Sequence, residues 1–171
     1  IGHARTYVVF DVIAKYLRSL NYQVFYLQNV TDIDDRIIDR AKRDGRSWQS
    51  VADEFTRAYE EDIKTIGVDS ISQYATATAH IYDILEQVKK LIECGYAYLV
   101  EGEGYYFNLT KFPDYGKLSG RTVAESEDAT SRIDESTKKK NKGDFVLWRL
   151  SSKDAPGWDS EFGYGRPGWH I

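Results

Sequence analysis

The sequence predicts an α/β fold: part of a Rossmann-type, doubly wound parallel domain that lacks its first strand, with an inserted α+β connective module. Apolar residues recur at helical spacing over residues 6–20. A short apolar run without alternation follows at residues 24–27, as is typical of a parallel strand covered on both faces. The chain runs from Ile1 directly into the helical pattern, so we expect no strand before that helix.

Three further helices are expected after the first strand. Acidic residues at 32–35 precede a helix that ends at Gly45. Ser47 is positioned to cap the next helix, which ends near Gly67. The last helix has an apolar stripe over residues 81–92 and ends at Gly95. Helices that alternate with buried strands are typical of an α/β domain.

The pattern changes after residue 95. Residues 96–100 and 105–109 are predicted to form a β-hairpin around a Glu-Gly-Glu-Gly turn. Residues 123–144 are polar, which predicts a mobile surface segment, and residues 145–148 predict another buried strand. We therefore divide the chain into residues 1–66, the first part of the Rossmann domain; 67–144, the connective insertion; and 145–171, a return to the domain.

Composition limits the possible classes of protein. The chain has 171 residues, 42% of them hydrophobic and 29% charged, which is ordinary for a soluble globular protein. No apolar run approaches the roughly 20 residues of a membrane helix, so no membrane partner is expected. A single cysteine, Cys94, suits a reducing compartment, and we expect a cytoplasmic protein. The net charge of −4 means that any contact with nucleic acid needs a local basic patch.

Residues suited to ligand binding lie near both ends of the chain. Gly2 and His3 precede a helix, where backbone N–H groups and the helix dipole favour nucleotide phosphates, although an ordinary turn and cap explains them equally well. Thr31 follows the predicted strand, at the edge where open α/β sheets bind ligands. Thr31 and Asp32 would serve equally well as caps of the next helix. Trp169 lies in a Gly- and Pro-rich loop, where an indole can line a pocket or simply pack.

Several separated motifs resemble one known family. Residues 1–6, Ile-Gly-His-Ala-Arg-Thr, are similar to the end of the His-Ile-Gly-His signature of class I aminoacyl-tRNA synthetases and the helix that follows it. More particular motifs resemble the cysteinyl-tRNA synthetase family: Asn-Val-Thr-Asp-Ile-Asp-Asp at 29–35, Gly-Asp-Phe-Val-Leu-Trp at 143–148 and Gly-Arg-Pro-Gly-Trp-His-Ile at 165–171. The resemblance covers the whole chain in the family's order.

This resemblance implies a Rossmann catalytic domain that is split by a connective insertion. It implies an ATP-dependent ligase that activates L-cysteine as cysteinyl-adenylate and transfers the cysteinyl group to tRNA(Cys). His3 would then be catalytic and bind the ATP phosphates with Gly2, and Thr31 and Trp169 would contact the substrate. The family's first signature histidine would precede Ile1, so we expect this chain to be a fragment that is inactive alone.

The resemblance also implies zinc in the whole enzyme. A zinc ion that binds the substrate thiolate distinguishes cysteine from serine directly. The family's ligands, two cysteines, a histidine and a glutamate, all fall outside this chain, which has no CxxC or HxxxH pair. We therefore expect no zinc site in this chain and a packed core position for Cys94.

Other functions remain open. The cysteine ligase of mycothiol synthesis has similar motifs but joins cysteine to an amino sugar. A non-catalytic tRNA-contacting or structural module is a further possibility, because residues 138–142 form a basic run, although its nearly neutral surroundings favour a solvated loop. The strand at 24–27 would have an unpaired edge, so we also expect self-association or a companion segment of the same enzyme.

Overall fold

The computed structural model describes residues 2–120 and 136–171. The chain divides into two units, Ile1–His80 and Ile81–Ile171. The first contains a parallel sheet and the second an antiparallel sheet, each with its own helices, so the predicted α/β content is confirmed. Within the described ranges, no helix is long and apolar enough to cross a membrane.

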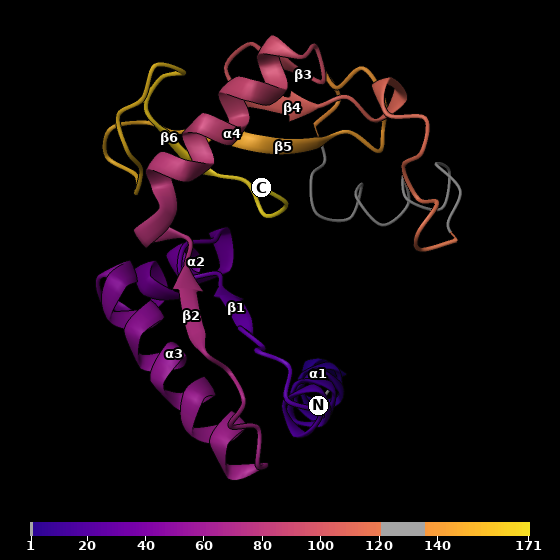
Figure 1. The fold of residues 1–171 in the computed structure, drawn as a ribbon. Coiled ribbons are helices and arrows are strands. Elements are labelled where there is room, and N and C mark those ends of the chain that lie inside the picture. Colours follow the sequence, from indigo (N-terminus) through magenta and orange to yellow (C-terminus); the bar gives the residue numbers. More distant parts are fainter. Residues whose placement is uncertain (1, 121–135) are drawn as a thin grey trace. The chain divides into compact units, whose positions relative to one another are not determined.

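A two-stranded parallel sheet and three α-helices make up most of the first unit (Figure 1). Its elements are α1 (Gly2–Ser19), β1 (Leu27–Val30), α2 (Asp35–Asp44), α3 (Trp48–Thr65), β2 (Gln73–Thr76) and the short 3-10 helix η1 (Thr78–His80). The strands pair in register from Leu27 with Gln73 to Val30 with Thr76. Because both strands end together, the residues that follow them meet at one edge of the sheet.

Helix caps set the boundaries of α2 and α3. Asp34 accepts a hydrogen bond from the backbone N–H of Arg36 (2.7 Å), and Gly45 ends α2 with a φ of 62°. Ser47 accepts a hydrogen bond from the backbone N–H of Ser50 (3.2 Å) at the start of α3. These caps satisfy backbone groups that lack a partner within the helix. The boundaries predicted at Gly45 and Ser47 are confirmed.

The strand predicted at residues 24–27 lies further along the chain, at Leu27–Val30, and is less buried than expected. Phe25 and Leu27 are 69% and 52% exposed, so this segment is not covered on both faces. The strand begins where its backbone pairs with β2, a strand that the sequence analysis did not predict. The Tyr26 carbonyl already accepts a hydrogen bond from the N–H of Ser72 (2.8 Å) just before the ladder begins. The predicted parallel pairing is nevertheless confirmed.

Helix α1 begins at Gly2, earlier than the predicted start at residue 6, and a polar cluster attaches it to the loop before β2. Buried Asp11 accepts hydrogen bonds from the N–H groups of Asp69 (3.1 Å) and Ser70 (2.9 Å). Lys15 Nζ lies 2.6 Å from Asp11 and 2.7 Å from Asp69. Burial alone would raise the pKa of Asp11, but the hydrogen bonds from Lys15, Ser70 and Asp69 lower it to about 2. The cluster therefore fixes α1 with an ionised carboxylate.

In the second unit, helix α4 packs on a four-stranded antiparallel sheet (Figure 1). Its elements are α4 (Ile81–Glu93), β3 (Ala97–Val100), β4 (Gly104–Phe107), the 3-10 helix η2 (Leu109–Lys111), β5 (Phe145–Leu150) and β6 (Gly165–Pro167), with strand order β3-β4-β5-β6. The predicted hairpin and the buried strand after residue 144 are confirmed. Strand β5 pairs antiparallel to β4 and so extends the sheet of the hairpin.

Large side chains fill the core of the second unit. Val88 of α4 packs with Leu147 and Trp148 of β5, and all three are at most 1% exposed. The indole Nε1 of Trp148 donates a hydrogen bond to the Gly163 carbonyl (3.3 Å), so its polar atom is also satisfied. The core thus joins the helix, the sheet and the loop before β6.

A fully buried carboxylate lies within the segment that the sequence predicts to be a mobile surface loop. Asp144 accepts hydrogen bonds from the Tyr98 hydroxyl (2.7 Å) and from the N–H groups of Leu109 (2.9 Å) and Asn141 (3.1 Å). The predicted surface position is therefore wrong for Gly143 and Asp144, whereas residues 136–142 are exposed or half-buried, and residues 123–135 lie outside the described ranges. Composition misleads here because Asp144 is a polar residue in the sequence, yet its side chain is buried and satisfied by several hydrogen-bond donors.

Candidate functional site

Thr31 lies at the carboxyl edge of the parallel sheet, directly after β1, and is half-buried. On one side of it, the Val30 carbonyl accepts a hydrogen bond from the N–H of Ala77 (3.0 Å). On the other side, Asp32 accepts a hydrogen bond from the N–H of Thr78 (3.0 Å). The backbone around Thr31 is therefore held against the segment that follows β2.

Asp32 does not cap α2, although its sequence position would permit that role. The cap is Asp34. One carboxylate oxygen of Asp32 accepts from the backbone N–H of Thr78, and the other bonds the Thr78 hydroxyl. The two residues are 46 positions apart. A contact at this separation cannot be deduced from local spacing, and the sequence analysis missed Thr78.

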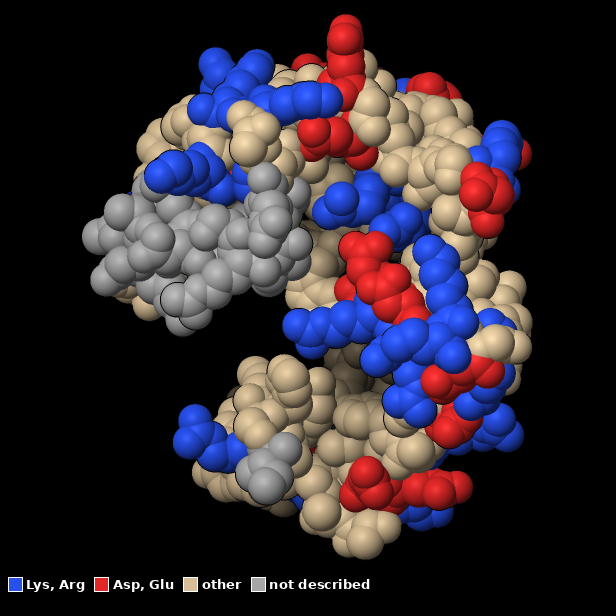
Figure 2. All heavy atoms as spheres, turned by 180° about the vertical axis from the view of Figure 1, so that it is seen from behind, with Lys and Arg blue, Asp and Glu red and all other residues tan. Residues whose placement is uncertain are grey.

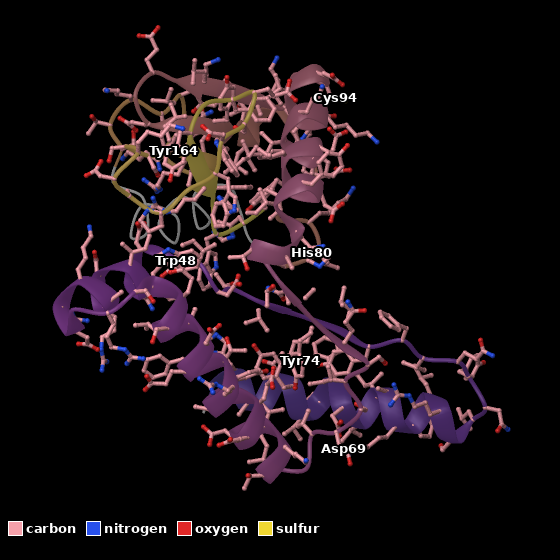
Figure 3. All side chains as sticks on the ribbon, turned by 90° about the vertical axis from the view of Figure 1, so that its left-hand side faces the viewer. Trp48, Asp69, Tyr74, His80, Cys94 and Tyr164 are labelled. Carbon is pink, nitrogen blue, oxygen red and sulfur yellow. The ribbon has the colours of Figure 1, made fainter. Side chains whose placement is uncertain are left out.

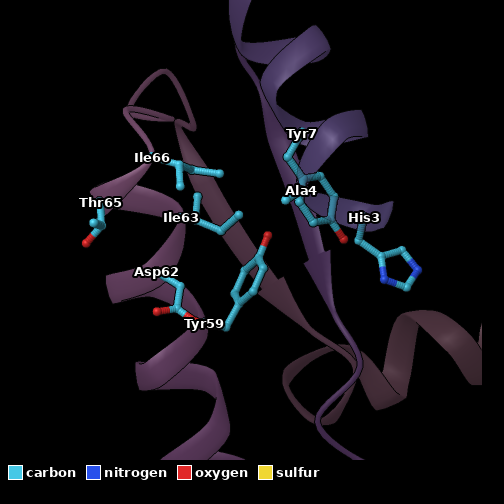
Figure 4. A pocket seen from close by; sticks show the side chains of 8 residues that line it. All are labelled: His3, Ala4, Tyr7, Tyr59, Asp62, Ile63, Thr65 and Ile66. Atoms are coloured by element: carbon cyan, nitrogen blue, oxygen red, sulfur yellow. The ribbon is translucent and has the colours of Figure 1, made fainter. Parts of the chain in front are cut away.

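His3 lies in the first turn of α1 beside a hollow between α1 and α3 (Figure 4). The hollow has a volume of about 390 Å³ and is lined by His3, Ala4, Tyr7, Tyr59, Asp62, Ile63, Thr65 and Ile66. The exposed imidazole of His3 stacks on the ring of Tyr7, with ring centroids 6.5 Å apart. Thr31 is not among the lining residues. The predicted nucleotide-binding histidine thus has an open space beside it.

Tyr59 joins this hollow to the sheet. Its ring packs edge-on against Tyr7 (5.8 Å between centroids) and Tyr74 (6.4 Å), and its hydroxyl accepts a hydrogen bond from Gln28 Nε2 of β1 (2.6 Å). Burial raises the pKa of Tyr59, nearby Tyr7 raises it further, and the Gln28 bond opposes this rise. Tyr59 is therefore a neutral hydroxyl. Among Tyr7, Tyr59, Tyr74 and Gln28, only Tyr7 could have been found from the sequence, because it lies one helical turn after His3.

Gly2 faces open space. A Cβ atom there would meet nothing within 4 Å, so no packing contact among the described residues requires glycine. The predicted need for glycine concerns the close approach of a nucleotide, and it stays a prediction.

Trp169 belongs to the second unit and its side chain is 56% exposed. The backbone before it is tightly packed on β5. A Cβ atom at Gly168 would lie 1.9 Å from the Val146 carbonyl oxygen, and one at Gly165 would lie 2.3 Å from that of Arg149. The close contact with β5 therefore requires glycine at both positions. Trp169 directly follows this tightly packed backbone. Of the predicted site residues, Gly2, His3 and Thr31 lie in the first unit and Trp169 in the second.

All 171 residues match the family model described as the tRNA synthetases class I (C) catalytic domain. The chain belongs to this family. It is 47% identical to the Cysteine--tRNA ligase of Thermoplasma acidophilum, and 45% identical to those of Aeropyrum pernix and Aquifex aeolicus, over 171 residues each. Each alignment covers 100% of this chain but only 37%, 36% and 34% of these relatives. The chain thus spans about a third of their length, and the predicted family resemblance is confirmed.

The resemblance to cysteinyl-tRNA synthetases implies a zinc ion, but the described residues of this chain do not form a site that fits one. Cys94 is exposed just after α4 (Figure 3), so the prediction of a packed core thiol is wrong. Gly95 turns the chain directly after it with a φ of 76°. In residues 2–120 and 136–171, no three His, Cys, Asp or Glu side chains gather to hold a metal ion. We therefore derive no chemical step through zinc.

The basic run at residues 138–142 of this synthetase-family chain makes contacts within its own unit. Lys138 Nζ lies 3.5 Å from Glu103, and Lys140 Nζ lies 4.4 Å from the centre of the Tyr98 ring. On the face shown in Figure 2, basic side chains are interspersed with acidic ones. These contacts favour a role within the fold over an independent nucleic-acid surface.

Proposed function

We propose that this chain is part of the catalytic domain of a cysteine–tRNA ligase that activates L-cysteine with ATP and transfers it to tRNA(Cys). Relatives named Cysteine--tRNA ligase, 45% to 47% identical over all 171 residues, support this assignment. The observation that carries it is the position of Thr31 at the carboxyl edge of two parallel strands, where α/β domains bind their substrates.

The chain corresponds to the first part of a Rossmann-type domain without its first strand, followed by the connective insertion and a return to the domain. Residues 1–66, 67–144 and 145–171 are these three parts. Strand β1 and helices α1, α2 and α3 support the first part, while the parallel partner β2 (Gln73–Thr76) lies within residues 67–144. Exposed Val9, Phe10 and Val12 on α1 support a companion segment of the same ligase that covers this helix, or self-association in its absence.

Activation of cysteine requires positioning and control of charge. A carboxylate oxygen of cysteine attacks the α-phosphorus of ATP, the bond to the bridging oxygen breaks, and pyrophosphate leaves. His3 stands at the N-terminus of the 18-residue helix α1, where the helix dipole and the imidazole together stabilise phosphate charge. Gly2 leaves space for the nucleotide, because a Cβ atom there would meet no atom of the described residues within 4 Å.

The remaining predicted residues select and orient cysteine. Thr31 supplies a hydroxyl from a backbone that is fixed on both sides. Trp169 supplies an exposed indole face for a wall of the amino-acid pocket. In the second step a terminal hydroxyl of the tRNA attacks the carbonyl carbon of the adenylate, and AMP leaves.

The test uses the full-length ligase that contains this chain, assayed by cysteine-dependent exchange of pyrophosphate with ATP. Trp169→Ala should lower kcat/KM for cysteine at least about 10-fold, because it removes the pocket wall. Cys94→Ala is the control and should change the value less than about twofold, since the thiol is exposed and is not one of the proposed site residues. Equal effects of the two variants would exclude Trp169 from the pocket.

The acceptor distinguishes the two ligase functions. Transfer of the activated cysteine to tRNA(Cys) supports the proposal. Transfer to an amino sugar, with no charging of tRNA, would assign the mycothiol-type reaction instead. A full-length protein that shows no cysteine-dependent exchange would contradict both.

A further inference from the structure

We infer that Asp32 and Thr78 form a clamp that positions Thr31 for cysteine. The inference rests on the proposed function and extends it, because it assigns two positioning residues that do not touch the substrate themselves. The clamp is made of the bidentate contact between the Asp32 carboxylate and the N–H and hydroxyl of Thr78.

The clamp joins the residues that follow the two parallel strands. Val30, the last residue of β1, is bonded through its carbonyl to the N–H of Ala77 (3.0 Å). Asp32 is bonded to the next residue, Thr78, through both carboxylate oxygens. Two successive cross-links therefore connect β1's end to β2's end, and Thr31 is the single residue between them.

Other residues of this segment have different roles. Ile33 is 4% exposed and belongs to the core, and Asp34 caps α2. Val30 completes the ladder and Asp32 forms the clamp. Thr31 has no side-chain hydrogen bond to any other described residue, so its hydroxyl is available to a substrate while the backbone on both sides of it is held.

A clamped loop binds a small substrate better than a mobile one. A mobile Thr31 would lose conformational freedom each time that cysteine binds, and affinity would fall by that amount. Fixing the loop in advance removes this loss, and productive geometry depends on such support from neighbouring residues. The clamp should therefore affect cysteine binding far more than ATP binding, which is assigned to Gly2 and His3.

The experiment separates the clamp from general stability. In the full-length ligase, Thr78→Val removes the hydroxyl but keeps the backbone N–H and the side-chain shape. We expect it to raise KM for cysteine about 5- to 10-fold, the size of one typical lost hydrogen bond, and to leave KM for ATP within about twofold. Thr78→Ser restores the hydroxyl and should return KM for cysteine to within about twofold of the parent value.

Asp32 has a matched control two residues away. Asp32→Asn places an amide NH2 against one of the two donors of Thr78 and should raise KM for cysteine at least about 10-fold. Asp34→Asn removes the same charge but retains helix capping, because asparagine caps as well as aspartate, and should leave both KM values unchanged.

Each outcome is decisive. If Thr78→Val matches Thr78→Ser, or raises KM for ATP and cysteine equally, the clamp does not position Thr31. An active parent enzyme with a normal Thr78→Val variant overturns this inference alone. A parent enzyme without cysteine-dependent exchange overturns the proposed function, and this inference with it.

Discussion

The two units differ in how completely they bury their apolar side chains. Among the described residues, twelve of the seventeen exposed large apolar side chains lie in the first unit. The buried apolar residues of the first unit are all Ala, Val or Ile, whereas the second unit buries Trp148 and Tyr106 completely. The second unit therefore has a core of its own. The first has an exposed apolar surface of the kind that another segment or a second copy covers.

Polar contacts hold the first unit where its core is small. Arg18 donates hydrogen bonds to the carbonyls of Val24 (3.0 Å) and Ser70 (2.9 Å), and Asp11 binds the same loop. The clamp between Asp32 and Thr78 belongs to the same set of long-range polar contacts. The unit that carries His3 and Thr31 thus adds these polar contacts to a core of small buried side chains. Such a region is expected to respond first to pH and to changes at its surface.

The largest effect should come from the core of the second unit. Trp148→Ala removes a fully buried indole and its bond to Gly163, and should lower the free energy of unfolding by about 3–5 kcal/mol. Leu99→Ala, at an exposed position of the same sheet, is the control and should lower the free energy of unfolding by less than about 1 kcal/mol. Denaturant unfolding followed by circular dichroism measures both. Similar costs would mean that the second unit has no independent core.

A smaller effect concerns acid and the first unit. The pKa of Asp11 is lowered from 3.8 to about 2, so its stabilising contribution is complete above pH 3.8 and is lost as the pH falls towards 2. Because Lys15 is about half exposed, water screens part of the interaction, and we expect a loss of about 1–2 kcal/mol.

Unfolding curves between pH 2 and pH 7 test this loss. Asp11→Asn should be less stable than the parent chain at neutral pH, and the difference should shrink as the pH falls below about 4. Asp39→Asn, on the exposed surface of α2, is the matched control and should show no such trend. A difference that stays constant with pH would show that the charge of Asp11 contributes nothing.

Sequence reasoning succeeded where structure is decided locally. Ser47 and Gly45 mark helix ends because a side-chain oxygen or a positive φ is needed at that residue itself. The strand at Leu27–Val30 was misplaced because its position depends on β2, more than 40 residues away. The bonds of Asp32 to Thr78 and of Tyr59 to Gln28 were missed for the same reason. Asp144 was missed for a different reason: it is fully buried, although it lies in a polar segment whose composition is typical of a surface loop.

The smallest effect on stability should come from the exposed face of α1. Val12 is 58% exposed, so Val12→Ser should change the free energy of unfolding of this chain by less than about 0.5 kcal/mol. The same change should reduce self-association, because it removes apolar surface that a second copy would cover. Light scattering over a range of concentrations measures the mass, and Asp39→Asn again serves as the control. A parent chain that is already a monomer at every concentration would show that this face is not adhesive, and the need for a covering segment would then rest on the family match alone.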